Sequence, residues 1–190
     1  MSRQPKILLI GADCTGKTTL AKSLAEHYSI EHIPNRRIKD DKDAVLAVQQ
    51  FAHGKMRGSE GFILDQWQYP VDIVYNRALG TSHADRQSPM EEIQDEIRTV
   101  MQEQDVIIIW LWAHSGDIRL RFEQRGDELW NLDQILEVNR RYAPTLVSLK
   151  LYYHFVDTTK ETPLQVFNKT KSFIDKRLGG ELKWDPKLYC

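Results

Sequence analysis

A glycine-rich segment near the N-terminus has the residues needed to bind phosphate. Residues 11–18 read Gly-Ala-Asp-Cys-Thr-Gly-Lys-Thr and match the pattern GxxxxGK[ST] at every fixed position. The glycines allow the backbone N–H groups to converge on an anion, and the following helix points its positive end at the same place. Lys17 would place its charge against the β- and γ-phosphates, and the Thr18 hydroxyl can ligate Mg²⁺. The residues expected to hold the nucleotide are Gly11, Asp13, Cys14, Thr15, Gly16, Lys17, Thr18 and Thr19.

Asp65 is a second candidate, because it directly follows the apolar run Gly61-Phe62-Ile63-Leu64. A carboxylate at the carboxyl end of a strand beside the glycine-rich segment can hold Mg²⁺ through water, or activate the oxygen of an acceptor. A helix-capping aspartate is the structural alternative. We predict that Asp65 is both a catalytic and a metal-binding residue.

Two arginines are spaced to share one face of a helix. Arg121 and Arg125 are four residues apart in a charged segment that follows the longest apolar run of the chain. Arginines at this place can close over a triphosphate and offset the charge of the transition state. A solvated charged helix is the alternative. The sequence therefore predicts an arginine-bearing lid at about residues 115–130, and a catalytic set that joins both arginines to Lys17 and Asp65.

Candidate acceptor-binding residues lie after the second and third predicted strands. Arg36 and Arg37 could form a fork that binds a phosphate, although they could equally belong to a basic surface loop. Trp67 and Tyr69 could stack on a base, and Phe51 could line the same pocket from a neighbouring helix. Ordinary packing would explain these three aromatic residues as well.

Apolar runs and helical periodicity alternate along the 190 residues, which fit one domain over 1–190. The expected strands cover 6–10, 30–33, 61–65, 106–112 and 152–156. The expected helices cover 17–28, 43–56, 71–79, 90–101, 117–124, 132–149 (interrupted or ended near Pro144) and 163–178. This alternation predicts an α/β fold in which helices cover both faces of a parallel sheet.

Composition restricts the class of protein further. The net charge of −1 gives no global field for nucleic acid. Cys14 and Cys190 stand in no zinc-binding pattern, and such cysteine usage suits a reducing compartment. The apolar runs are too short for a signal peptide or a membrane span, so we expect a cytoplasmic protein without a membrane partner.

Four stretches resemble the thymidylate kinase and deoxynucleoside kinase group of P-loop kinases, including phage-type deoxynucleotide kinases. Asp13 matches an acidic residue of the thymidylate kinase loop, which implies a contact to the acceptor sugar or its phosphate. Residues 64–67 resemble the Asp-Arg-Tyr signature, residues 119–126 the arginine-rich lid, and residues 138–142 the Val-Arg-x-x-Tyr stretch. The resemblance implies a three-layer P-loop kinase fold with a five-stranded parallel sheet in the order 2-3-1-4-5, and ATP as the donor.

The resemblance also implies a reaction, namely Mg²⁺-dependent transfer from ATP to a (deoxy)nucleoside monophosphate, as in thymidylate kinase. Gln66 stands where the family has an arginine for the acceptor phosphate, and this favours a hydroxyl acceptor instead: a deoxynucleoside, or a hydroxymethylpyrimidine in DNA. The net charge counts against DNA as the acceptor. A P-loop NTPase or nucleotide-binding module is the alternative from another class. A homodimer through helix 90–101 and a docking role for the tail at 179–190 are left open.

Overall fold

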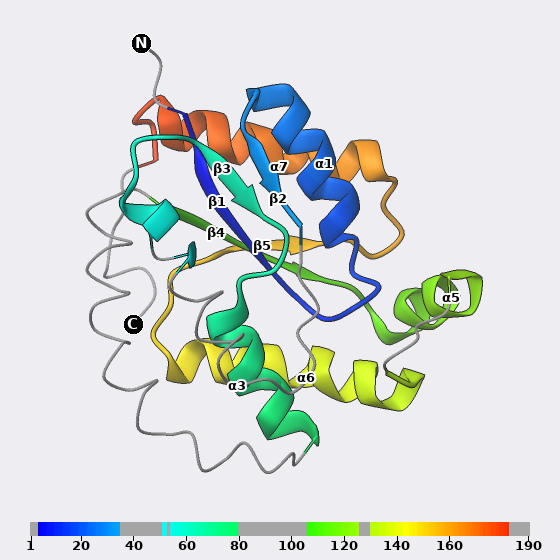
Figure 1. Cartoon of the computed structure of the whole chain (residues 1–190). Coiled ribbons are helices and arrows are strands. Elements are labelled where there is room, and N and C mark those ends of the chain that lie inside the picture. Colours follow the sequence, from blue (N-terminus) through cyan, green and yellow to red (C-terminus); the bar gives the residue numbers. More distant parts are fainter. Residues whose placement is uncertain (1–3, 35–50, 53, 80–105, 126–129, 183–190) are drawn as a thin grey trace.

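The computed structural model describes residues 4–34, 51–52, 54–79, 106–125 and 130–182. Strands and helices alternate along these residues (Figure 1). The strands are β1 (Lys6–Ile10), β2 (Glu31–Ile33), β3 (Phe62–Leu64), β4 (Val106–Trp112) and β5 (His154–Asp157). The main helices are α1 (Lys17–Tyr28), α3 (Gln68–Leu79), α5 (Ser115–Arg125), α6 (Leu132–Ser148) and α7 (Pro163–Leu178). None of the helices in the described ranges has the length and apolar character needed to span a membrane.

The five strands form one parallel sheet in the order β2-β3-β1-β4-β5, which confirms the expected topology. β1 lies in the middle, where Leu8 is in register with Leu64 of β3 and with Ile108 of β4. Every residue of β1 is buried, as expected for a strand that is covered on both faces. The carboxyl ends of all five strands therefore meet at one edge of the sheet, and the chain leaves β1 there through residues 11–16.

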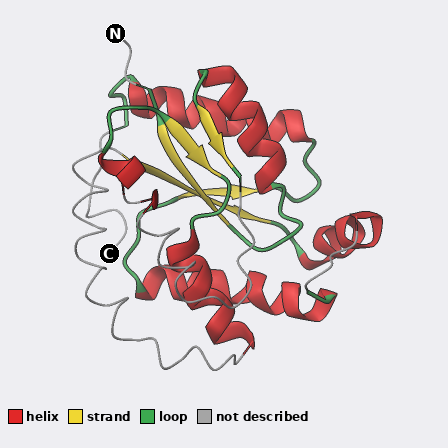
Figure 2. Ribbon diagram, viewed as in Figure 1, coloured by secondary structure: helices red, strands yellow, loops and turns green. Residues whose placement is uncertain are grey.

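Helices cover the sheet in two layers, so the fold has three layers as expected (Figures 1 and 2). α1 and α7 pack on one face, where Leu9 and Ile63 share one buried cluster with Leu24 and Ile174. α3 and α6 pack on the other face, which contains Leu8, Trp110 and Tyr142 among its buried residues. Successive side chains of a strand point to opposite faces of the sheet, so each strand contributes residues to the buried cluster on either face.

Pro144 does not interrupt or end its helix, and that expectation was wrong. α6 continues from Leu132 to Ser148 with Pro144 inside it. The proline lies on the exposed side of α6, so the carbonyl group that loses its N–H partner faces water. Tyr142 and Leu146, both fully buried, hold the helix against the sheet on either side of the proline.

Two of the predicted segments lie wholly or mostly outside the described residues. The helix expected at 90–101 lies outside the described residues. Most of the helix expected at 43–56 also lies outside them, and its residues 51–52 and 54–56 are described and helical. The docking role expected of the tail concerns residues 183–190, which are also outside the described part.

A histidine in β5 should make the stability of the protein dependent on pH. His154 stacks on Phe173 of α7, with ring centroids 3.7 Å apart and planes 3° from parallel. Burial lowers the pKa of His154 below its ordinary value of 6.5. His154 therefore binds a proton more weakly in the folded chain than in the unfolded chain. As a result, the free energy of unfolding should fall as the pH drops through 6.5.

Urea unfolding between about pH 5 and 8 measures this effect. The variant His154→Phe keeps the stacking partner of Phe173 and removes the titrating group, so its stability should vary less with pH than that of the wild type. An equal pH dependence in the two proteins would contradict the prediction.

Candidate active site

The segment that joins β1 to α1 folds into an anion-binding loop. Gly11 has φ 146°, and a Cβ atom there would lie only 2.4 Å from the carbonyl oxygen of Leu111. Gly16, at the N-terminus of α1, has φ 95° and no atom within 4 Å of its ideal Cβ position. Cys14 between them also has a positive φ of 62°. Gly11 must therefore be a glycine, because a side chain there would collide with β4. At Gly16, by contrast, the N-terminus of α1 has free space beside it that an anion could occupy.

Lys17 reaches back over this loop from the first turn of α1. Its Nζ donates to the carbonyl oxygens of Gly11 and Ala12, at 2.8 and 2.7 Å. Burial lowers the pKa of Lys17, and the carboxylates of Asp13 and Asp65 act in the opposite direction. The ammonium group therefore lies in a poorly solvated place, where a phosphate anion would be attracted strongly.

Asp65 directly follows β3 and is held firmly by the backbone. Its N–H donates to the carbonyl oxygen of Ile33 at 2.9 Å, and Trp67 N–H donates to Leu9 at 2.9 Å. The residue is 2% exposed. Burial raises the pKa of its carboxyl group, while a hydrogen bond from Thr18, the charge of Lys17 and the nearby His32 oppose that rise.

The donor atoms at Asp65 and Thr18 fit a magnesium ion. Oδ1 of Asp65 is buried and has no hydrogen-bond partner among the described residues, and Thr18 is exposed on α1. Both offer oxygen, which Mg²⁺ prefers, and this ion usually keeps water and substrate phosphates as its other ligands. Within the described ranges no group of three or more His, Cys, Asp or Glu residues is placed to hold a metal unaided. A metal at Asp65 and Thr18 would therefore need ligands from the nucleotide.

Gln66 has a strained backbone at the place where the resembling family carries arginine. Its φ is 117°, and its side chain is 8% exposed. The hydrogen bonds of its neighbours Asp65 and Trp67 to the two adjacent strands hold it in this conformation. Backbone strain of this kind costs about 1–3 kcal/mol and is concentrated at functional sites.

The two arginines of α5 have different surroundings. Arg121 is half-buried and donates to the carbonyl oxygens of Cys14 and Thr158, at 3.2 and 2.6 Å, and to the Thr158 hydroxyl at 3.0 Å. Arg125 is exposed, and its charge is close enough to lower the pKa of Lys17. Arg121 therefore ties the phosphate loop to the segment after β5, whereas the role of Arg125 at a bound phosphate stays a prediction.

Alanine variants should separate these two roles. Arg121→Ala should lower the free energy of unfolding by about 1–3 kcal/mol, because it leaves buried carbonyl groups without a donor. Arg125→Ala should leave stability unchanged and lower the rate of phosphoryl transfer about 100-fold. Thermal unfolding and transfer assays measure both, with the exposed Arg119→Ala on the same helix as the control. Equal losses of stability in Arg121→Ala and Arg125→Ala would contradict the assignment.

Three further residues complete the walls of the loop, and the sequence singled out only Tyr142 among them, as part of the stretch 138–142. Tyr142 of α6 donates its hydroxyl to the carbonyl oxygen of Gly11 at 3.0 Å. Thr158 Oγ1 lies 3.2 Å from the carbonyl oxygen of Thr15. Tyr75 of α3 donates to Oδ2 of Asp13 at 2.9 Å. The family resemblance of residues 138–142 was a signal for Tyr142, and a tyrosine within an otherwise apolar helical pattern was the signal available for Tyr75. No signal in the sequence pointed to Thr158.

The three aromatic residues predicted to bind the acceptor do not lie together. Trp67 and Tyr69 are 2% and 1% exposed and pack against each other with ring centroids 5.4 Å apart, so neither ring faces solvent. Phe51 lies at the opposite, amino-terminal edge of the sheet, near Lys55, which pairs with Glu31. Their role in binding a base stays a prediction. Arg36 and Arg37 lie outside the described residues.

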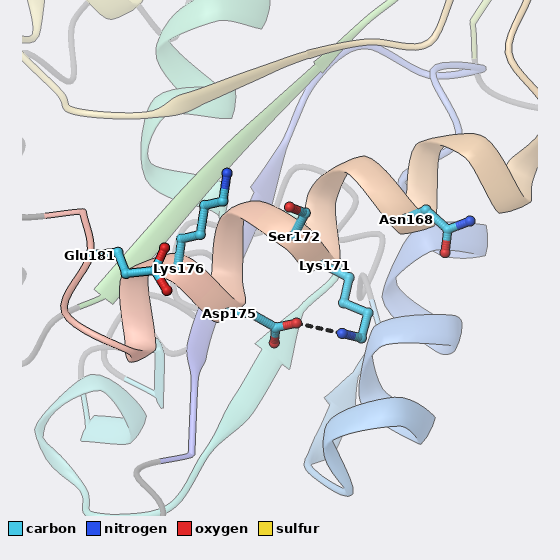
Figure 3. A pocket seen from close by; sticks show the side chains of 6 residues that line it. All are labelled: Asn168, Lys171, Ser172, Asp175, Lys176 and Glu181. Carbon is cyan, nitrogen blue, oxygen red and sulfur yellow. Dashed lines mark hydrogen bonds and ion pairs between the residues drawn. The ribbon is translucent and has the colours of Figure 1, made fainter.

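A hollow of about 470 Å³ is found away from the phosphate loop, on α7 (Figure 3). Asp175 in its wall accepts from the hydroxyl of Tyr28 on α1 at 2.8 Å, and also pairs with Lys171. The hydrogen bond from Tyr28 joins α1 to α7, so we interpret the hollow as part of the packing between these two helices. Its lining residues are Asn168, Lys171, Ser172, Asp175, Lys176 and Glu181.

These features give the chain the fold of the P-loop kinases, with a parallel sheet in the order 2-3-1-4-5 and a phosphate loop between β1 and α1. A family model described as an AAA domain matches residues 6–57. No curated protein sequence matches the chain.

Solved structures match along almost the whole chain. YorR from Bacillus subtilis, in complex with phosphorylated GDP, is 19% identical with a TM-score of 0.69, covering 90% of this chain and 95% of its own. Deoxyadenosine kinase from M. mycoides, with dCMP and dCDP bound, is 12% identical with a TM-score of 0.63, covering 90% and 98%. Thymidylate kinase from Candida albicans is 18% identical with a TM-score of 0.56, covering 96% of each chain.

Proposed function

We propose that the protein is an ATP- and Mg²⁺-dependent kinase that phosphorylates a nucleotide, a (deoxy)nucleoside monophosphate kinase of thymidylate kinase type. The observation that carries the proposal is the meeting of Lys17, Thr18 and Asp65 at the carboxyl edge of the sheet, beside a loop built to bind an anion. Phosphoryl transfer requires mainly positioning and the neutralisation of charge, and these side chains supply both.

Each residue of the site has a definite part in this reaction. Lys17 attracts the β- and γ-phosphates, and Arg125 adds a second positive charge near it. Thr18 and Asp65 would hold the Mg²⁺, which neutralises phosphate charge when it is bound. The loop N–H groups and the N-terminus of α1 orient the triphosphate, so that the transferred group faces its acceptor.

A nucleotide acceptor is supported by Asp13 and by the similar structures. Asp13 is half-buried in the loop, and its carboxylate is held by Tyr75, so it can accept a hydrogen bond from a sugar hydroxyl. Three of the proteins with similar structures are named for a nucleotide or nucleoside or hold one: thymidylate kinase, deoxyadenosine kinase, and YorR with phosphorylated GDP. We extend this substrate class to the present chain.

A second candidate is a kinase for a hydroxyl group, on a deoxynucleoside or on a hydroxymethylpyrimidine in DNA. Gln66 offers no charge for an acceptor phosphate at the place where an arginine would be expected. Asp65, whose pKa is raised by burial, could take the proton that a hydroxyl loses on attack. These two observations favour an uncharged acceptor.

Transfer of label from γ-labelled ATP distinguishes the candidates. The purified protein would be incubated with Mg²⁺ and one acceptor at a time: nucleosides, nucleoside monophosphates, or normal and hydroxymethylated DNA. GTP would be tried as an alternative donor. The variant Lys17→Met would measure the background of label transfer. Label in a nucleoside diphosphate is the result we expect. Label on a nucleoside or on DNA would replace the first candidate by the second. ATP hydrolysis without transfer to any acceptor would indicate an NTPase and contradict both.

A further inference from the structure

His32 lies beside Asp65, although the two belong to different strands. His32 is in β2 and is in register with Ile63 of β3. Side chains alternate along a strand, so Asp65, two residues after Ile63, shares the face of the sheet on which His32 lies. Ile63 packs with the residues of α1, and this face is therefore the one from which Thr18 approaches Asp65.

Two polar atoms at this place have no hydrogen bond to any described residue. Nε2 of His32 is 3.8 Å from Oδ2 of Asp65, which is longer than a hydrogen bond. Nε2 of His32 and Oδ1 of Asp65 are both buried, and neither has a hydrogen-bond partner in the part of the chain that the structure describes. Buried polar atoms are nearly always hydrogen-bonded, so two such atoms on adjacent side chains indicate a site that is completed by a ligand or a small movement.

We propose that His32 is a positioning residue for Asp65: with nucleotide bound, Nε2–H of His32 donates to Oδ2 and leaves Oδ1 for the ligand. A movement of about 1 Å would bring the two atoms within hydrogen-bond distance. This proposal rests on the proposed function, because it takes Asp65 as part of the reacting site.

The arrangement suits this role on geometric grounds. An aspartate side chain can rotate, and a carboxylate that is held by Thr18 alone could turn either oxygen toward a ligand. A donor on the neighbouring strand removes that freedom, and the short, rigid histidine side chain costs little entropy to place. The outer partners of metal-binding carboxylates act in this way and affect metal affinity when they are removed.

Binding of Mn²⁺ to the complex of the protein with ADP tests the role without requiring an acceptor. Electron paramagnetic resonance would report free Mn²⁺ for the wild type, His32→Leu and His32→Gln, because glutamine keeps an N–H donor at similar reach. His154→Leu removes another half-buried strand histidine and is the matched control. Thermal unfolding of all four proteins would accompany the titrations.

We expect His32→Leu to weaken Mn²⁺ binding about 10-fold, and to lower kcat by a similar factor with little change in the KM for ATP. His32→Gln should keep most of the Mn²⁺ affinity and most of kcat. His154→Leu should match the wild type in Mn²⁺ affinity. Equal Mn²⁺ affinity in His32→Leu and the wild type, or equal losses in the leucine and glutamine variants, would overturn the proposal.

The proposed function and the proposed role of His32 can fail independently of each other. If the wild type labels no acceptor but the Mn²⁺ titrations give the expected pattern, the phosphotransfer proposal fails and the role of His32 is supported. If the wild type labels an acceptor and His32→Leu behaves like the wild type, only the role of His32 is lost.

Discussion

Replacing Lys17 by methionine should lower the rate of phosphoryl transfer about 1000-fold while the protein remains folded. Lys17 is 6% exposed, and its ammonium group lies against the loop that would hold the phosphates. Methionine has nearly the same length and keeps the apolar part of the side chain, so the variant removes the charge and little else. In a poorly solvated site that charge acts on the transition state with little screening by water.

Transfer of label from ATP to the acceptor that the wild type uses measures this loss. Lys22→Met is the matched control, because Lys22 is an exposed lysine of the same helix, and the control should keep the wild-type rate. Thermal unfolding would verify that both variants are folded. Activity of Lys17→Met at more than about a tenth of the wild-type rate would contradict the assigned role.

The second large effect is expected for Asp65→Asn, which should lower kcat about 1000-fold. Asparagine has the same shape but neither carries the charge that a metal ion requires nor accepts a proton. The raised pKa of Asp65 means that the folded protein binds a proton more readily than the unfolded chain does, so wild-type stability falls as the pH rises through that pKa. Above that pH, the asparagine variant should therefore be at least as stable as the wild type.

Steady-state kinetics and urea unfolding at neutral pH test both parts of this prediction. Asp133→Asn, which changes an exposed carboxylate in the first turn of α6, is the control and should alter neither quantity. A variant that loses activity only because it unfolds would show a lower free energy of unfolding, and that outcome would remove Asp65 from the reacting site.

Local patterns were sufficient for the strands and for the phosphate loop. An apolar run, a glycine-rich turn and an amphipathic helix follow one another within residues 6–28, and the structure has β1, the loop and α1 in those positions. The order of strands followed from the family resemblance. The expected break at Pro144 failed because the effect of a proline depends on the face of the helix on which it lies, and that face is determined by tertiary packing.

The surroundings of the loop could not be predicted in the same way. The action of Arg121 on the phosphates, predicted from its charge and spacing, stays a prediction, but its hydrogen bonds to backbone carbonyl groups of two segments far apart in the sequence were not foreseen. Trp67 and Tyr69 follow a strand just as base-stacking residues would, but both belong to the buried core that also contains Val74 of α3. Residue type and spacing do not contain these long-range contacts, which arise when the layers pack together.

The central position of β1 has a consequence for synthesis of the protein on the ribosome. The phosphate loop is made early, but Tyr142, which contacts Gly11, is 131 residues further along the chain, and Thr158 is 143 residues beyond Thr15. A nascent chain therefore contains the complete phosphate-binding motif long before it has the walls that hold the motif in shape. β1 must also wait for β4, so an apolar strand is exposed during elongation, as in other slowly folding parallel sheets. The ability to bind nucleotide should arise only when β5 and the residues after it have emerged, and chaperones would find β1 accessible until then.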